Sequence, residues 1–353
     1  MAERVTVVGA GLTGLTVGLL CARAGHEVRV VDAGLRVGTP QGLMAAPATV
    51  QQELAYHHVW RWAGNQALYE YAEQVRLGQE FVLAAAGDMG VAVHRADMAT
   101  VTADGMEAFW LRHEVKAMRS ARFDPVFTDT TGLPFSTRPQ LISAAQPVVD
   151  PVLYRDGLVA ALTEAGGELV AAPPADADSG WVVSTTPDPV FDGVSMRSRL
   201  RPATWNWVSF TAPELPTRHM FDLDDGGRVL AVMADRAYLG SRRAPSLDWV
   251  TRHVEEVEIL DQWQAVTAAT FDQQPFVGYA GPRRLVACGF DAWELTLGSA
   301  AAIQLAAVIS DENMRLPWAP VRLPKLASVG RAAWGAMRYG MKISPVTPFP
   351  KRG

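Results

Sequence analysis

Three glycines near the start of the chain, Gly9, Gly11 and Gly14, have the G-x-G-x-x-G spacing that binds phosphate through backbone amides. The β-branched residues 5–8 before them predict a buried strand, and the apolar residues after them predict a helix that ends at Gly25. In such a turn the first glycine permits the tight bend, the second lets a pyrophosphate approach, and the third lets the helix pack closely on the sheet. Unpaired N–H groups at the start of the helix then favour an anion.

An acidic residue follows this turn at the end of the next predicted strand. Residues 28–31 form that strand, and Asp32 lies 18 residues after Gly14. A carboxylate at this place accepts hydrogen bonds from the ribose hydroxyls of a dinucleotide. Asp32 followed by Ala33 argues against a 2′-phosphate, so the sequence predicts a dinucleotide other than NADP.

A second strand, turn and helix pattern lies near the other end of the chain. Residues 284–288 predict a strand that ends at Gly289, and a helix rich in small residues is expected over 298–309. Here again a helix N-terminus faces a polar ligand. Two such sites at opposite ends of one chain fit a ligand longer than a mononucleotide.

Composition limits the class of protein. The chain has 353 residues, 49% of them hydrophobic, which suffices for two domains or for one domain with a large insertion. Cys21 and Cys288 are the only cysteines, which excludes a disulfide framework and a cysteine-rich metal site and leads us to expect a cytoplasmic protein. The glycine turn explains the apolar run at 5–21 better than a signal peptide does, and no other run is long enough to span a membrane.

Charge is unevenly distributed along the chain. The net charge is −5, yet the last 41 residues carry eight Lys or Arg and no acid. Apolar residues among them suggest an amphipathic helix, which could dock on an anionic membrane, a protein partner or a second copy, or pack on the acidic body of its own chain. We expect no nucleic-acid partner and no metal.

Periodicity predicts how the elements are organised. One helix is expected from Gln52 to about Glu80, and an antiparallel sheet is expected within 202–243. The further predicted helices cover residues 104–120, 153–165 and 247–256. We expect an α/β protein with a discontinuous cofactor domain (1–85, 145–195 and 265–325), a mixed or antiparallel-sheet substrate domain (86–144 and 196–264) and a basic tail (326–353).

Beyond the glycine turn, three segments resemble the D-amino-acid oxidase-like flavoproteins. Residues 182–186 (VVSTT) look like the family's strand that ends in a flavin contact. Residues 263–278 (WQAVTAATFDQQPFVG) resemble its segment ending in TPDGxPxIG. Residues 287–309 (ACGFDAWELTLGSAAAIQLAAVI) resemble its closing motif, ATGFGxxGxTxGxAAAxLLADLI. The resemblance covers most of the chain and points to the branch of glycine and sarcosine oxidases and γ-glutamylputrescine oxidoreductase-like enzymes, without a Rieske domain.

The resemblance implies a GR2-type Rossmann domain that binds FAD in extended form, and a second domain that covers the flavin ring. The implied reaction is hydride transfer to flavin N5 from a C–H bond beside the nitrogen of an amine or modified amino acid. The residues placed against FAD are Gly9, Gly11, Leu12, Thr13, Gly14, Asp32, Ala33, Thr39, Gln41, Gly42, Leu43, Met44, Val170, Thr185, Gly289, Asp291, Ala292, Trp293, Glu294, Leu295 and Thr296.

Departures from the family pattern fall in the expected substrate pocket. Thr267 stands where glycine oxidases carry an arginine for the substrate carboxylate, which places simple α-amino acids in doubt. Ala269 stands where sarcosine oxidases tether FAD through cysteine, so we expect non-covalent FAD. No lysine occurs between Lys116 and Lys325, although such oxidases use a lysine for the reaction with O2.

Glu294 replaces a glycine next to the flavin. It is either an acquired base or cation-binding group, or the mark of a decayed site. Trp293 is a candidate pocket wall, and Arg242 is a candidate for an anionic substrate group; together with Thr267 and Glu294 these are the candidate catalytic residues. The alternative to an FAD-dependent oxidoreductase is a flavin-binding partner or structural subunit with little catalysis of its own.

Overall fold

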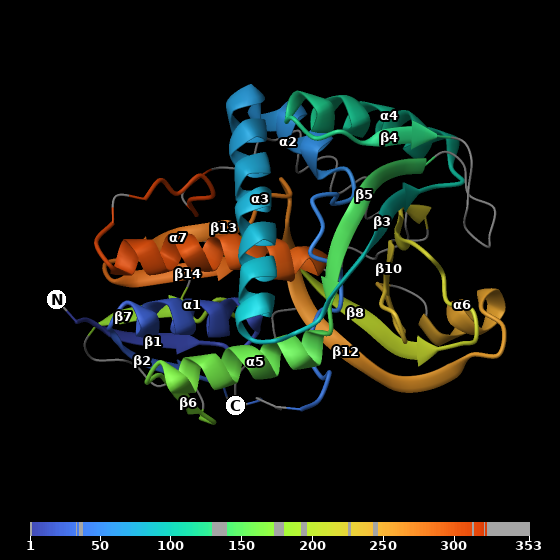
Figure 1. Ribbon diagram of the computed structural model, residues 1–353. Coiled ribbons are helices and arrows are strands. Elements are labelled where there is room, and N and C mark those ends of the chain that lie inside the picture. Colours follow the sequence, from blue (N-terminus) through green and yellow to red (C-terminus); the bar gives the residue numbers. More distant parts are fainter. Residues whose placement is uncertain are drawn as a thin grey trace.

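The computed structural model describes residues 2–32, 34, 38–128, 140–172, 180–191, 196–224, 227–242, 246–312, 314–320 and 322. Two β-sheets lie side by side in it (Figure 1). The expected basic tail, residues 326–353, and the expected cofactor contact Ala33 lie outside the described residues.

The six-stranded sheet carries the glycine turn. Its order is β13-β14-β7-β1-β2-β6, and its pairs are parallel except for the antiparallel pair of β13 and β14. The bounds are β1 (Arg4–Val8), β2 (Glu27–Val31), β6 (Glu168–Val170), β7 (Trp181–Ser184), β13 (Phe276–Gly281) and β14 (Arg284–Cys288). Such a sheet needs helical cover, because parallel strands are hydrophobic on both faces.

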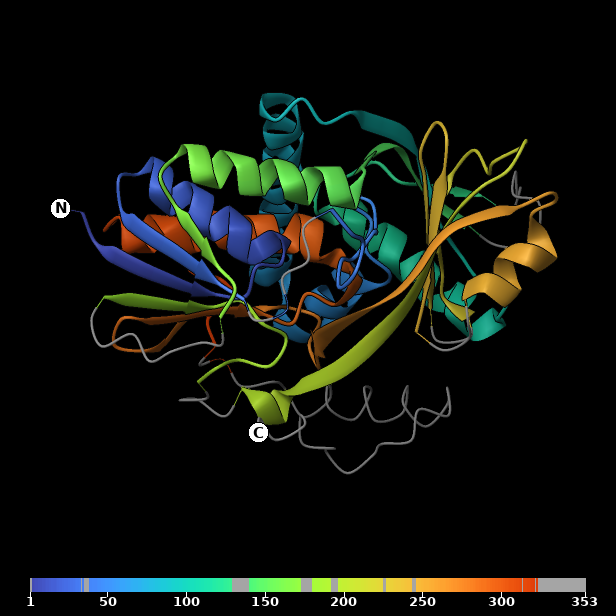
Figure 2. The same cartoon turned by 90° about the horizontal axis from the view of Figure 1, so that it is seen from below.

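Three helices lie on one face of this sheet (Figure 2): α1 (Leu12–Arg23), α5 (Pro151–Glu164) and α7 (Ser299–Ile309). The α5 helix begins at Asp150, whose carboxylate accepts hydrogen bonds from the amides of Val152 and Leu153. By contrast, α1 begins at Gly11 with no side-chain cap. Its first amides are therefore available to another acceptor.

The eight-stranded sheet has the order β12-β8-β11-β10-β9-β3-β5-β4, antiparallel except for β3 and β9. The bounds are β3 (Val93–Val101), β4 (Val126–Thr128), β5 (Gln140–Val149), β8 (Leu200–Thr211), β9 (His219–Asp222), β10 (Arg228–Val232), β11 (Ala237–Ser241) and β12 (Glu258–Thr270). The mixed second sheet confirms the expected fold class. Strands β5 and β12 each cross a domain boundary placed from the sequence, at 145 and 265.

The helix expected over 52–80 is wrong in its extent, because the chain forms two helices there. Ala55–Ala63 is α2 and Asn65–Asp88 is α3, and they meet at Gly64 with φ +88°. That left-handed backbone suits glycine and ends α2. The other helices are α4 (Gly105–Ser120), α6 (Ser246–His253) and the short 3-10 turn Arg197–Arg199.

The segment before α7 is wound differently from an α-helix. A 3-10 turn, Asp291–Trp293, leads into a π-helical turn, Glu294–Gly298, and only then into α7. Within the described residues one run, Asp291–Ile309, is long and apolar enough to cross a membrane, but 83% of its 18-residue apolar window is buried inside the protein, as expected for a core helix. Gly78 of α3 lies directly on this turn, since a Cβ on it would be 1.9 Å from the carbonyl oxygen of Thr296.

Candidate functional site

The glycine turn is held by close backbone packing. A Cβ on Gly14 would lie 1.9 Å from the carbonyl oxygen of Gly9, so α1 could not approach β1 with any other residue there. Gly9 itself has φ +105°. The hydroxyl of Thr185, just after β7, donates to the carbonyl oxygens of Val8 and Gly9 at 3.0 and 3.1 Å. These contacts fix the path of the turn toward α1.

Gly11 borders an open space at the N-terminus of α1. Among the described residues, only Glu294 Oε1 comes within 4 Å of a Cβ built on Gly11, at 3.1 Å. The same oxygen lies 3.4 Å from the amide nitrogen of Thr13 and 3.2 Å from its hydroxyl oxygen. A carboxylate thus stands where the N-terminal amides of α1 favour an anion.

Asp32 follows β2 and binds the turn from the other side. One carboxylate oxygen accepts the amide of Ala10 at 2.8 Å, and the other accepts the amide of Gly34 at 2.7 Å. Each oxygen keeps lone pairs for a further donor. Asp32 is half-buried, so its carboxylate can still meet a ligand.

The loop at residues 39–44 is attached to β12. The amide of Gly42 donates to the carbonyl of Gln264 at 3.2 Å, and the indole of Trp263 donates to the carbonyl of Leu43 at 2.9 Å. Trp263 stacks on Trp207, and Trp207 on Trp205, with ring centroids 6.1 and 6.0 Å apart. This tryptophan stack joins the loop to a cavity between the sheets.

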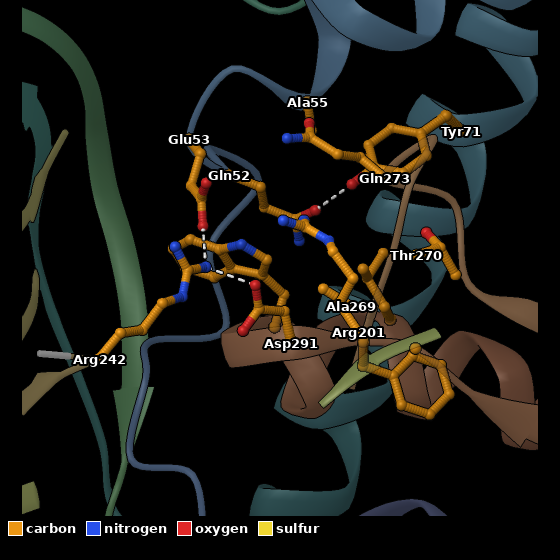
Figure 3. Close-up of a pocket in the computed structure, with 14 residues that line it drawn as sticks. Gln52, Glu53, Ala55, Tyr71, Arg201, Arg242, Ala269, Thr270, Gln273 and Asp291 are labelled. Carbon is orange, nitrogen blue, oxygen red and sulfur yellow. Dashed lines mark hydrogen bonds and ion pairs between the residues drawn. The ribbon is translucent and has the colours of Figure 1, made fainter. Parts of the chain in front are cut away.

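That cavity has a volume of about 70 Å³ and lies where the segment after β14 meets β8, β11 and the residues before α2. Figure 3 shows its polar lining. The polar lining residues are Gln52, Glu53, Tyr71, Arg201, Arg242, Thr270, Gln273 and Asp291, and the others are Ala55, Ala269, Gly289, Phe290, Trp293 and Leu297.

Arg242 is neutralised by two acids in this cavity. Its guanidinium donates to Glu53 at 2.7 Å and also contacts the carboxylate of Asp291 (Figure 3). The indole N–H of Trp205 donates to Asp291 as well, at 2.9 Å. Although burial opposes it, the two carboxylates hold the pKa of Arg242 above its usual value. Burial raises the pKa of Glu53, against the pull of Arg242.

Arg201 lies in the same cavity and forms no ion pair with an acid in the described part of the chain. Its Nε is buried and has no hydrogen-bond partner among the described residues. Burial lowers the pKa of Arg201, and the nearby negative charge of Asp291 partly restores it. Two more buried polar atoms of the lining lack partners in the same way, Thr270 Oγ1 and Gln273 Oε1. Buried polar atoms are normally satisfied, so these three could form hydrogen bonds to a ligand in the cavity.

Comparison with known proteins gives the family. The model of the family described as DAO, FAD dependent oxidoreductase, matches residues 4–194, more than half of the chain. The chain belongs to the FAD-dependent oxidoreductase family. No curated protein sequence matches it significantly. The resemblance noted in the sequence is therefore confirmed at the level of this family.

Solved structures share the fold of this FAD-dependent oxidoreductase. Glycine oxidase from Geobacillus kaustophilus has a TM-score of 0.72 at 16% identity, over 91% of this chain and 99% of that one. L-Proline dehydrogenase from P. horikoshii has 0.69 at 14%, over 91% and 97%. Iminodiacetate oxidase from Chelativorans sp. BNC1 has 0.66 at 15%, over 90% and 99%.

The glycine turn of this FAD-dependent oxidoreductase fits the pyrophosphate of FAD. Gly11 leaves room for it, and the amide and hydroxyl of Thr13 already hold one anionic oxygen, that of Glu294. The expected contacts Thr185 and Asp32 border the same turn, and Val170 pairs with Val31 next to Asp32. Gly11 to Thr13 could therefore hold the pyrophosphate, and Asp32 could hold the ribose.

The candidate catalytic residues fall into two groups. Arg242 and Trp293 line the cavity, whereas Thr267 and Glu294 do not. The Thr267 hydroxyl donates to the carbonyl of Asp291 at 3.1 Å, and Glu294 points to the cofactor turn instead. Sequence reasoning missed Glu53 and Arg201. Glu53 has φ +52°, which no pattern signals, and Arg201 reaches the site only because β8 pairs with β12, opposite Ala269.

Proposed function

We propose that this protein uses non-covalently bound FAD to oxidise a C–N bond of an amine or amino-acid-like substrate that carries an anionic group. The observation that carries the proposal is the set of three buried atoms without a partner among the described residues, on Arg201, Thr270 and Gln273, in a cavity that Trp293, the residue before Glu294, also lines. When bound, FAD supplies a hydride acceptor for the C–H bond beside the substrate nitrogen, and the substrate leaves as an imine.

Arg201 is the residue we assign to the anionic group. Its guanidinium presents donors in a planar fork that matches a carboxylate. Arg242 is less suited to this role because Glu53 and Asp291 already bind it. Glycine oxidases carry their carboxylate-binding arginine at the position of Thr267. Arg201, on the neighbouring strand β8, takes its place here.

Gln273 and Thr270 complete the binding set. The Gln273 carbonyl oxygen can accept an N–H from the substrate nitrogen, and the Thr270 hydroxyl can donate to or accept from a second polar group. Trp293 adds an apolar wall to the lining. These residues bind and orient the substrate, while the pair of Glu53 and Asp291 holds Arg242 fixed between them.

Ala269 supports non-covalent attachment, because it lines the cavity and has no thiol. Acid precipitation of the FAD-loaded protein should then leave all flavin in the supernatant. Flavin that stays with the pellet would contradict this part of the proposal.

Anaerobic reduction of the bound flavin tests the reaction. We would mix the FAD-loaded protein with amino acids, N-alkylated amino acids and the amines that lack their carboxylate, and follow the visible absorbance of oxidised flavin. We expect carboxylated substrates to reduce the flavin of the wild type. R201M should lower this reduction by about tenfold or more, since one charge-assisted hydrogen bond contributes about 1.5–3 kcal/mol. R201K should keep part of it. The exposed Arg252 provides the control R252M.

Two outcomes would count against the proposal. If R201M affected carboxylated and carboxylate-free substrates equally, Arg201 would not bind the anionic group. If no substrate reduced the flavin, the alternative of a flavin-binding partner with little catalysis would be favoured, in line with the Glu294 carboxylate at the cofactor turn.

A further inference from the structure

Glu294 occupies the anion position at the start of α1. Its Oε1 lies 3.2 Å from the Thr13 hydroxyl oxygen and 3.4 Å from the Thr13 amide nitrogen, and it is the described atom that faces Gly11. These are the donors that the family's turn offers to the cofactor pyrophosphate. The carboxylate is half-buried and has no basic partner in the described part of the chain.

The π-helical turn places Glu294 there. Gly298 closes this turn against α1, since a Cβ on it would lie 2.2 Å from the Thr13 hydroxyl and 3.2 Å from Cγ of Glu294. Glycine at 298 therefore leaves the space through which the Glu294 side chain reaches Thr13. π-Helical turns are rare and occur frequently at functional sites.

A carboxylate and a pyrophosphate cannot share these donors. Both carry negative charge, and at contact distance two like charges in a partly dehydrated site repel strongly. The cofactor must therefore displace the carboxylate or bind after it is protonated. Burial raises the pKa of Glu294, while the hydrogen bonds from Thr13 oppose that rise.

We propose that Glu294 is a built-in competitor for the cofactor pyrophosphate, which caps α1 in the free protein and must leave Thr13 when FAD binds. It follows that the charge and reach of residue 294 set the affinity for the diphosphate part of FAD, and not for its adenosine part. The inference rests on the FAD-binding part of the proposed function but not on the substrate chemistry.

Ligand fragments separate these contributions. We would measure binding of FAD, ADP, inorganic pyrophosphate and adenosine to the FAD-free protein by calorimetry, for wild type, E294Q and E294D. Glutamine keeps the shape without the charge, and aspartate keeps the charge without the reach. The exposed Glu312 provides the matched control E312Q.

We expect E294Q to bind FAD, ADP and pyrophosphate about tenfold more tightly than wild type, because a neutral side chain competes less for the donors at the helix N-terminus. Adenosine affinity should not change, and E312Q should equal wild type. E294D should lie between, since its shorter side chain leaves Thr13. The FAD-free E294Q protein should also melt at a lower temperature, because α1 loses its anion.

Unchanged or weaker ADP binding in E294Q would overturn the inference, and so would an equal gain for adenosine. If E294Q does not fold, judged by circular dichroism, the same criteria apply to E294D. A failure of the substrate proposal is distinguishable, because it would leave these fragment affinities as they are.

Discussion

The guanidinium of Arg242 lies over the indole ring of Trp205, 4.6 Å from its centroid. Both side chains also bind the carboxylate of Asp291, which follows β14 of the other sheet. Arg242 and Trp205 therefore link the two sheets through one acid at the wall of the cavity.

Removal of Arg242 should destabilise the protein. In R242M, Glu53 and Asp291 would keep two half-buried negative charges without the cation that pairs with both, at a cost of about 3 kcal/mol. R242K should lose less unfolding free energy than R242M, because lysine keeps the positive charge. Some loss should remain, because lysine cannot bind both acids with a planar fork. Urea unfolding followed by circular dichroism measures the loss.

The exposed pair Arg29 and Glu168 provides the control, and R29M should change the free energy of unfolding by less than about 1 kcal/mol. Equal effects of R242M and R29M would refute this account.

Replacing Arg201 should have the opposite effect on stability. R201M removes a half-buried guanidinium whose Nε has no partner, so the substrate-free protein should gain about 1 kcal/mol of unfolding free energy. R201K should be close to wild type. Thermal melts without substrate measure the gain in stability of R201M. Melts with a carboxylated substrate should show that R201M loses the stabilisation that the substrate gives to the wild type. A destabilised R201M would mean that Arg201 serves the fold and not a ligand.

The three glycines of the turn should differ in what they tolerate. G14A places a Cβ 1.9 Å from the Gly9 carbonyl oxygen, so α1 must move away and the fold should be lost or weakened by several kcal/mol, as for severe overpacking. G11A meets only the flexible Glu294 side chain among the described residues, at 3.1 Å, so it should fold like wild type and lose FAD affinity. Circular dichroism and FAD titration together test this. A folded G14A with normal FAD binding would contradict the assignment.

His219 should make stability depend on pH. It is fully buried, accepts the amide of Val232 at Nδ1 and donates from Nε2 to the carbonyl of Gln146. Burial lowers the pKa of His219 from 6.5 to about 4. The unfolded chain therefore takes up a proton first, and stability present above pH 6.5 is lost as the pH falls toward 4, by about 3 kcal/mol.

The difference between wild type and H219Q isolates this effect, because other groups titrate in both proteins. One of them is Asp222, for which burial raises the pKa to about 6 and which acts in the opposite direction. Unfolding free energies at several pH values between 4 and 7 should converge for the two proteins as the pH falls. Parallel curves would show that His219 does not titrate between the two states.

The sequence predicted those features that local chemistry determines. The glycine turn, Asp32 after β2 and the start of α4 at its capping residue Asp104 all depend on residues close in the chain. The break at Gly64 was missed because an apolar period continued across it. The positions of the Arg201 and Glu294 side chains could not be predicted, because they depend on the register of β8 against β12 and on a π-helical turn. Such features arise from packing between distant segments.

The tryptophan stack affects the fluorescence of the protein. Excitation passes readily between near-parallel indoles in contact, and Trp205, Trp207 and Trp263 run from the cavity wall to the loop that carries Leu43. One end touches Arg242 and Asp291, and the other end holds the loop at residues 39–44. We therefore expect the ultraviolet emission of this stack to change, without any label, when a ligand binds at either of its ends.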